Sequence, residues 1–274
     1  MTESLARRNN EVQEPATLTD EAVHSDWLGL VGARVLVVGA GGIGTECAKG
    51  YAAAGARLLV ADRNPAALAA LASDPAFGGA LETLEIDLTE PGSGDAVVRT
   101  AIERLGGLDV VLHCVGINDR RPVLDFTEDD WNRVMDINLT SAFRVTQAAG
   151  RHMVAARSGR IVLLSSVSGL LAHQLHAPYA ASKGGLNQMM RVMANEWAAS
   201  GVTINAIAPG YIETNLTAAY LDKPGVRDKL TSQVPAGRLG IPGDVVGPIL
   251  FLSSRQAAFI TGHVLYIDGG RTLV

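Results

Sequence analysis

Residues 34–44 read Arg-Val-Leu-Val-Val-Gly-Ala-Gly-Gly-Ile-Gly, an apolar run that leads directly into a glycine-rich turn. The run has the length of a buried strand, and the residues after the turn, 45–54, have a helical pattern. Glycines let the backbone turn tightly, so that a pyrophosphate can reach the free N–H groups at the start of the helix. Asp62 follows the next expected strand, 57–61, about 20 positions after the glycines, where a carboxylate can bind a ribose hydroxyl. This context predicts a bound dinucleotide rather than a simple turn.

The same alternation of strands and helices continues along the chain. Further strands are expected at 81–86, 109–115, 160–165, 202–208 and 263–267, and helical segments at 94–105, 127–157 and 178–200. Strands that alternate with helices in this way predict an α/β fold: a single doubly wound parallel sheet, Rossmann-like, with helices on both faces. Ligands of such sheets bind at the carboxyl ends of the strands. The residues expected at this edge are Gly39, Asp62, Asp87, Gly116, Ser166 and Pro209.

Ser166, Tyr179 and Lys183 combine the groups needed to move a proton on or off an alcohol. Four residues along a helix place Tyr179 and Lys183 on one face. A free phenol titrates at about 10, and a nearby ammonium favours the phenolate, which brings the pKa of a tyrosine toward neutral pH. Ser166 can supply a hydroxyl that holds a substrate oxygen against the phenol. Because a lone Tyr–Lys pair is also an ordinary surface contact, the prediction of general acid–base catalysis depends on the nucleotide-binding unit upstream.

Composition narrows the classes of protein and partner. The 274 residues suit one sizeable domain, and a net charge of −5 without a basic stripe argues against a nucleic-acid partner. No apolar run of about 20 residues and no secretory pattern is present, so we expect a cytoplasmic protein with no membrane partner. Cys47 and Cys114 lie in apolar segments and are interpreted as reduced thiols. Residues 1–26 are polar without a sustained period, which predicts a flexible arm before a folded domain over 27–274.

Over residues 28–270 the chain resembles the short-chain dehydrogenase/reductase family. The features that carry the resemblance are Asn138, Ser166, Tyr179, Lys183, the Pro209-Gly210 turn and the closing Asp268-Gly-Gly. The resemblance implies an NAD(P)-dependent oxidoreductase that transfers a hydride between the nicotinamide and a secondary alcohol or ketone. Tyr179 would be the general acid/base, and Lys183 would lower its pKa and hold the nicotinamide ribose. Ser166 would polarise the carbonyl, and Asn138 would support a water in the proton relay.

The resemblance also implies a set of residues around the cofactor. Asp87 would contact the adenine, Pro209-Gly210 would face the nicotinamide, and Thr214 would contact the phosphates. The full set is Gly39, Gly41, Gly42, Ile43, Gly44, Asp62, Arg63, Asp87, Leu88, Gly116, Tyr179, Lys183, Pro209, Gly210, Ile212 and Thr214. Asp62 predicts NAD, because a carboxylate accepts hydrogen bonds from both ribose hydroxyls and repels a 2′-phosphate. Arg63 could pair with that phosphate, so NADP stays possible.

Two stretches depart from the family pattern. The usual T-G-x-x-x-G-x-G loop is one residue shorter here, with Val38 in place of the threonine, and the usual N-N-A-G is His113-Cys-Val-Gly116. Both departures concern the seat of the cofactor, whereas the catalytic set is complete. Within the family the chain is most similar to the sugar-acid dehydrogenases, such as the gluconate 5-dehydrogenases and 2-deoxy-gluconate 3-dehydrogenases. The 3-oxoacyl carrier-protein reductases are nearly as similar.

The substrate is the least determined part of the prediction. Charged and polar residues in the segment 211–239, including Tyr220, Asp222 and Lys223, favour a small polar molecule of sugar-acid or cyclic type over a long acyl chain. A carrier-bound 3-oxoacyl thioester is the alternative substrate. A dehydratase or epimerase that uses the cofactor transiently, and a non-catalytic nucleotide-sensing protein on the same fold, are alternatives of other classes.

Two pairs of residues near the expected substrate mouth have competing interpretations. Arg120 and Arg121 could bind a substrate carboxylate, although most such loop arginines are simply solvated. His173 and His176 could hydrogen-bond a polar substrate or have no role, and neither has a partner set for a metal, so no metal site is predicted.

The helices expected at 127–157 and 178–200 carry more apolar residues than one face of a sheet needs. Met189, Met190, Met193 and Trp197 are among them. Such a surplus indicates an interface, and we expect a homo-oligomer, a tetramer by family resemblance.

Overall fold

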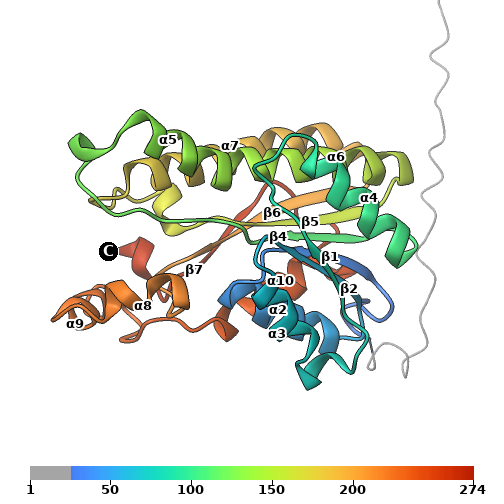
Figure 1. Cartoon of the computed structure of the whole chain (residues 1–274), viewed down its shortest axis with the longest axis horizontal. Coiled ribbons are helices and arrows are strands. Elements are labelled where there is room, and N and C mark those ends of the chain that lie inside the picture. Colours follow the sequence, from blue (N-terminus) through green and yellow to red (C-terminus); the bar gives the residue numbers. More distant parts are fainter. Residues whose placement is uncertain (1–25) are drawn as a thin grey trace, which may run out of the picture.

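Seven parallel strands form one sheet in the order β3-β2-β1-β4-β5-β6-β7 (Figure 1). The strands are β1 (Arg34–Val38), β2 (Arg57–Asp62), β3 (Glu82–Glu85), β4 (Val110–His113), β5 (Gly159–Leu164), β6 (Val202–Pro209) and β7 (Val264–Ile267). The chain builds outward from β1 to β3, returns to β4 and continues to the other edge at β7. The predicted single doubly wound parallel sheet is therefore confirmed.

The computed structural model describes residues 26–274. The flexible arm expected over residues 1–26 falls, apart from Asp26, outside the described residues. Within the described part of the chain, no helix is both long enough and apolar enough to cross a membrane.

Helices cover both faces of the sheet (Figure 1). One face holds α4 (Ser93–Leu105), α5 (Glu128–Met135), α6 (Ser141–Ala156) and α7 (Ala177–Trp197), and the other holds α2 (Gly42–Ala53), α3 (Pro65–Ala72) and α10 (Gly243–Ser253). Two short helices, α8 (Asn215–Leu221) and α9 (Val226–Thr231), form a lid with a small apolar cluster of its own. We call residues 211–239 the lid.

Alternate residues of each strand face the two helical layers. In β1, Leu36 and Val38 belong to the core under α4, α6 and α7, whereas Val35 and Val37 belong to the core under α2, α3 and α10. All four side chains are fully buried. Successive residues of a strand point to opposite faces, so a strand covered on both sides must be apolar at every position. This is why the continuous apolar run at residues 34–38 becomes a central strand.

The elements differ from the sequence expectations in three places. Helix α3 was not expected, although Asn64 caps it by accepting hydrogen bonds from the N–H groups of Ala66 and Ala67. The expected helical segment 127–157 is divided by a π-helical turn over Asp136–Thr140. The lid contains two helices, although no element had been expected over residues 211–239.

The residues named as a surplus for an interface are used inside the protomer. Met190 and Met193 are buried in the core, and Met189 and Trp197 pack against it. Trp197, at the end of α7, packs against α6, because a Cβ added at Gly150 would come within 2.6 Å of the indole ring. Met190 and Met193 are therefore not available to another chain, and the expected oligomer stays a prediction. The apolar side chains that this helical layer does expose are Trp131, Phe143 and Val192.

Candidate active site

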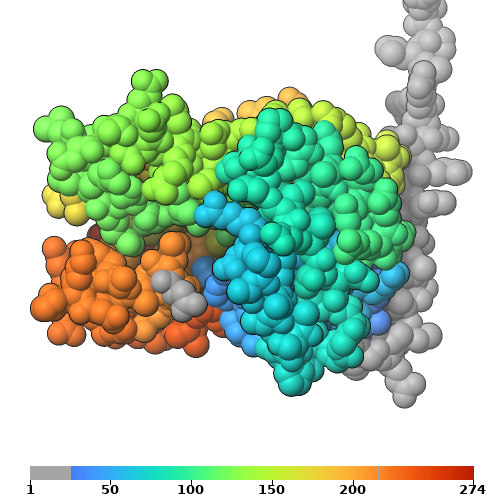
Figure 2. All heavy atoms as spheres, viewed as in Figure 1, coloured from blue at the N-terminus to red at the C-terminus, as the bar shows by residue number. Residues whose placement is uncertain are grey.

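The carboxyl ends of the strands open into a crevice between the helical layer of α5 and α7 and the lid. Figure 2 shows this hollow between the green segment and the orange lid. Beneath it lie two cavities, of about 200 Å³ and about 930 Å³. They are lined by most of the residues that the sequence predicted for the cofactor: Gly39, Gly41, Gly42, Ile43, Gly44, Asp62, Arg63, Asp87, Leu88, Gly116 and Thr214. Ile212 instead lines a separate cavity of about 180 Å³.

The glycine turn leaves room for a ligand at the start of α2. Gly39 has φ +104°, and a Cβ at Gly44 would come within 1.9 Å of the Gly39 carbonyl oxygen, so both positions require glycine. A Cβ at Gly41 would meet no atom within 4 Å. Helix α2 has no side-chain cap, and its first turn has no acidic residue. Despite the shortened loop, its N-terminus can therefore accept a phosphate.

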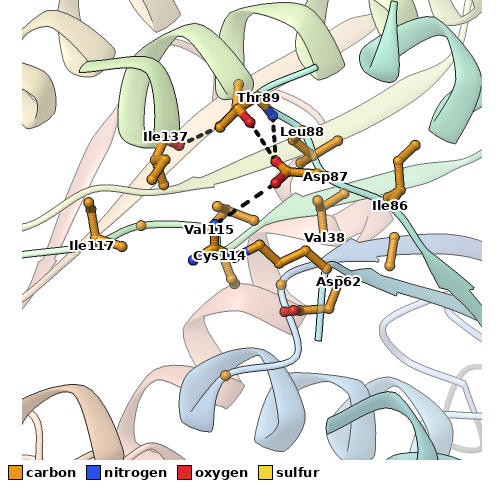
Figure 3. Close-up of a pocket in the computed structure, with 16 residues that line it drawn as sticks. Val38, Asp62, Ile86, Asp87, Leu88, Thr89, Cys114, Val115, Ile117 and Ile137 are labelled. Atoms are coloured by element: carbon orange, nitrogen blue, oxygen red, sulfur yellow. Dashed lines mark hydrogen bonds and ion pairs between the residues drawn. The ribbon is translucent and has the colours of Figure 1, made fainter. Parts of the chain in front are cut away.

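Carboxylates lie along the smaller cavity (Figure 3). Asp62 ties the glycine turn to β2, because its two oxygens accept hydrogen bonds from the N–H groups of Ala40 (2.7 Å) and Asn64 (2.8 Å). The backbone and hydroxyl of Thr89 donate to Asp87 and, with the more distant Arg63, lower the pKa of its carboxyl. These residues fit the ribose and adenine end of a dinucleotide.

Tyr179 projects from the first turn of α7 beside Ser166, which follows β5. The Ser166 oxygen accepts a hydrogen bond from the Ser168 N–H (3.1 Å), which leaves its own proton for the phenol. Burial raises the pKa of Tyr179, while the Ser166 hydroxyl and the charge of Arg120 lower it by less. Tyr179 is thus a neutral phenol at neutral pH in this structure and can donate its proton to a substrate oxygen.

Lys183 is buried one helical turn after Tyr179. Its ammonium donates to the Leu164 carbonyl oxygen (2.7 Å) and lies 5.7 Å from the centre of the Tyr179 ring. Burial lowers the pKa of Lys183 to about 8. Ser166 and Arg120 oppose the rise in the pKa of Tyr179 without overcoming it, and the role of Lys183 in lowering that pKa stays a prediction.

Asn138 is fully buried in the π-helical turn between α5 and α6. Its amide exchanges hydrogen bonds with the backbone of Ile117 (2.8 and 2.9 Å) and donates to Ser182 (3.1 Å). A Cβ added at Gly116 would lie 3.4 Å from Asn138 Oδ1 and 3.5 Å from Lys183 Nζ. Asn138 and Lys183 therefore face the same small space beside Gly116.

Sequence reasoning treated His113 only as a departure from the family pattern. Its side chain is buried at the end of β4, 3.2 Å from the Ser141 oxygen. Because the Ser141 hydroxyl donates to the Ile137 carbonyl (2.6 Å), the His113 Nε2–H is the donor to Ser141. Ile137 belongs to the π-helical turn that holds Asn138, so His113 supports that turn from below.

The two arginines of the loop after β4 have different environments. Arg121 is paired with Asp119 and Asp130. Arg120 has no carboxylate partner among residues 26–274; its Nε donates to His176 Nε2 (2.9 Å), and its guanidinium carbon lies 4.3 Å from the centre of the Tyr220 ring. The His176 ring lies 6.0 Å from the Tyr179 ring, so Arg120 is a half-buried cation next to the proposed acid/base.

His173 lies on the other side of His176, with 5.8 Å between the ring centres. Its Nδ1 is 2.8 Å from the Ser168 hydroxyl, and its ring lies 5.7 Å from that of Tyr211 in the lid. Within the described residues, no group of three or more His, Cys, Asp or Glu side chains could hold a metal ion.

A family model described as "Enoyl-(Acyl carrier protein) reductase" (adh_short_C2) matches residues 38–272. The chain belongs to the short-chain dehydrogenase/reductase family. It is 39% identical over 255 residues to gluconate 5-dehydrogenase of Gluconobacter oxydans, which covers 91% of this chain and 98% of that protein. It is also 36% identical to a 3-oxoacyl-[acyl-carrier-protein] reductase of Vibrio cholerae, over 90% of this chain and all of that protein.

Solved structures of the short-chain dehydrogenase/reductase family have the same fold. A gluconate 5-dehydrogenase from Burkholderia cenocepacia, in complex with NADP and tartrate, is 37% identical with a TM-score of 0.87, over 92% of this chain and 99% of that chain. The predicted family and reaction class are confirmed: the chain is an NAD(P)-dependent oxidoreductase that acts on CH–OH groups. When bound, the nicotinamide accepts or donates the hydride.

Proposed function

We propose that this enzyme interconverts a secondary alcohol and a ketone in a small hydroxy acid of the sugar-acid type. The observation that carries the proposal is Arg120, a half-buried guanidinium without a carboxylate partner among the described residues, next to Tyr179. Neither of its Nη atoms has a hydrogen-bond partner among residues 26–274, so its terminal edge is available to a ligand. A guanidinium binds a carboxylate through two parallel hydrogen bonds.

Four side chains would perform the chemistry at the reacting carbon. In the reducing direction Tyr179 donates its phenolic proton to the developing alkoxide, and in oxidation the phenolate accepts it. Ser166 holds the substrate oxygen against the phenol. Lys183 stabilises the phenolate and holds the nicotinamide ribose, and Asn138 supports the water through which the proton reaches solvent. Tyr179→Phe should remove nearly all turnover and leave cofactor binding largely intact, because the phenolic hydroxyl is lost while the shape of the ring is kept.

Three further properties belong to the same proposal. We propose a catalytic domain over residues 27–274, a homotetramer and a cytoplasmic location. The last is supported by the free thiols Cys47 and Cys114, since unpaired cysteines are typical of reducing compartments. NAD is proposed as the preferred cofactor because Asp62 lines the smaller cavity.

A 3-oxoacyl carrier-protein reductase is the second candidate, because such enzymes are among the relatives of similar identity. It has no use for a carboxylate-binding arginine at the catalytic tyrosine, since its substrate is a thioester. The alternatives of other classes are distinguished by the amount of reduced nicotinamide that forms or disappears. A nucleotide-sensing protein would turn over no substrate, and an epimerase or dehydratase would give product without a net change in reduced nicotinamide.

The test compares Arg120→Met with Arg121→Met as a matched control. Absorbance of the reduced nicotinamide would be followed with gluconate, with sorbitol, which has CH2OH in place of the carboxylate, and with an acetoacetyl thioester. Loss of a charge-assisted pair should lower kcat/KM for gluconate by roughly 10- to 100-fold in Arg120→Met without lowering kcat/KM for sorbitol, which has no carboxylate to pair with Arg120. Arg121→Met should have wild-type kcat/KM with both gluconate and sorbitol. Turnover of the thioester alone would reject the proposal in favour of the second candidate.

A further inference from the structure

The guanidinium of Arg120 is held on two sides by parts of the chain that face each other across the crevice. Arg120 belongs to the loop after β4, and its face is covered by the ring of Tyr220 at 4.3 Å. Tyr220 belongs to α8 in the lid. The contact therefore joins the lid to the catalytic side of the crevice. Cations prefer this position over an aromatic ring because the face of the ring is negative.

The second support fixes the edge of the guanidinium. His176 Nδ1 lies 2.9 Å from the Gln174 carbonyl oxygen, so that nitrogen must carry the proton. Nε2 is then a free lone pair and accepts the hydrogen bond from Arg120 Nε (2.9 Å). Burial and the charge of Arg120 lower the pKa of His176 to about 4, which keeps this tautomer neutral at physiological pH.

These two contacts leave one part of the guanidinium free. One edge is bonded to His176 and one face is covered by Tyr220, so the group cannot rotate without losing a contact. The remaining donors are the two Nη groups, for which the described residues supply no partner. A carboxylate that binds there lies in the plane of the guanidinium and does not compete with the ring over its face.

We propose that Tyr220 is a specificity-determining residue, which orients Arg120 for an in-plane carboxylate and so couples closure of the lid to the charge of the substrate. This rests on the proposed function, because it assigns Arg120 to the substrate carboxylate. An acid substrate completes the set of contacts around Arg120 with the lid in place. A neutral polyol leaves the Nη groups unpaired beneath the closed lid, which is a cost that selects against it.

The contact between the Arg120 guanidinium and the Tyr220 ring predicts different effects for different side chains at position 220. Phenylalanine keeps the ring and removes only the hydroxyl, whereas leucine keeps much of the apolar volume and removes the ring. Lys223 also faces Tyr220, at 5.7 Å from the ring centre, and does not take part in the contact with Arg120. Lys223→Met is therefore the control for a general change in the charge of the lid.

The experiment measures the ratio of kcat/KM for gluconate to kcat/KM for sorbitol. We expect this ratio to fall about tenfold in Tyr220→Leu, mainly through KM for gluconate, and to stay within twofold of wild type in Tyr220→Phe and Lys223→Met. A wild-type ratio in Tyr220→Phe would show that the ring, which orients Arg120, is what matters. Thermal unfolding of each variant is recorded to exclude a general loss of folding. A wild-type ratio in Tyr220→Leu, or an equal loss in Tyr220→Phe, overturns the inference.

A second measurement does not require turnover. Tartrate, a small hydroxy acid, is titrated by calorimetry into wild type and the Tyr220 variants, each with saturating NAD. Binding about tenfold weaker in Tyr220→Leu than in Tyr220→Phe supports the inference, and equal binding overturns it. If wild type turns over no sugar acid while tartrate discriminates these variants, the proposed substrate is wrong and the role of Tyr220 still holds.

Discussion

At the scale of one residue, the buried ammonium of Lys183 lowers the stability of the folded protein at a position that is proposed to serve catalysis. Its ammonium is buried with one hydrogen bond, to the Leu164 carbonyl, and without a carboxylate partner among the described residues. Burial lowers the pKa of the ammonium from 10.5 to about 8, and a depressed pKa of a buried lysine is a cost to the folded state. Groups placed for function often carry such a cost.

Replacing Lys183 by methionine should therefore stabilise an inactive protein. The pKa difference corresponds to about 3 kcal/mol below pH 8, and loss of the bond to Leu164 returns about 1 kcal/mol, which leaves a gain of about 2 kcal/mol. Urea unfolding at pH 7 would measure it, with Lys229→Met, an exposed change on α9, as the control. Because the unfolded lysine keeps its proton up to higher pH, the advantage should shrink between pH 8 and pH 10.5. A destabilised Lys183→Met would contradict this account.

Asp62 gives a prediction about the choice of cofactor. Its carboxylate is fixed by the N–H groups of Ala40 and Asn64 on the wall of the smaller cavity. A 2′-phosphate beside it would be repelled, whereas ribose hydroxyls would donate to it. We expect kcat/KM to be higher with NADH than with NADPH, and Asp62→Ser to narrow the difference by at least about tenfold. Higher kcat/KM with NADPH in wild type would make the prediction wrong and give Arg63 the larger role.

The sequence predicted much of the site but could not assign different roles to the neighbouring arginines Arg120 and Arg121. The glycine turn and the Ser–Tyr–Lys spacing carry their chemistry in local patterns, and most of the predicted cofactor residues do line the two cavities. Arg120 and Arg121 have no such local signal. Their roles are separated only when folding places Asp119 and Asp130 beside one and Tyr220 beside the other.

At the scale of elements, the break between α5 and α6 positions the site more than either helix does. The π-helical turn carries Asn138 inward, and its Ile137 carbonyl is bonded through Ser141 to His113 at the end of β4. Periodicity predicted one continuous segment over 127–157, because the chain is helical on both sides of the π-helical turn and no glycine or proline marks the break. Helix α3 was overlooked for another reason: its cap, Asn64-Pro65, was present in the sequence, but the segment is short.

Because His113 is buried beside the π-helical turn, we expect it to make the free energy of unfolding depend on pH. Burial lowers its pKa from 6.5 to about 3, so the folded protein keeps it neutral while the unfolded chain binds a proton below pH 6.5. Its contribution to stability is therefore complete above pH 6.5 and is lost as the pH falls toward 3, by up to about 1.4 kcal/mol per pH unit. In His113→Asn the slope of unfolding free energy against pH between 6 and 4 should be shallower by about that amount. Equal slopes in the two proteins would show that His113 is already charged in the folded state.

At the scale of the whole molecule, the helical layer of α5, α6 and α7 is the candidate interface. It exposes Trp131, Phe143 and Val192, although each helix has already buried one side in the core. Figure 1 shows these helices side by side on one face of the sheet. Exposed aromatic side chains on adjacent helices are typical of surfaces that associate in pairs. Met190 and Met193, which the sequence had suggested, play no part in this argument, because they lie in the core of the protomer.

We therefore predict that light scattering will give four times the chain mass of 28.7 kDa. Phe143→Glu should lower that mass to the dimer or the monomer, because it places a charge within a surface that excludes water in the assembly. Val31→Glu is the matched control: Val31 is also an exposed apolar residue (64% against 41% for Phe143), but it precedes β1 and lies outside the helical layer. An unchanged mass in Phe143→Glu would move the interface to another face. A monomeric wild type would reject the tetramer itself.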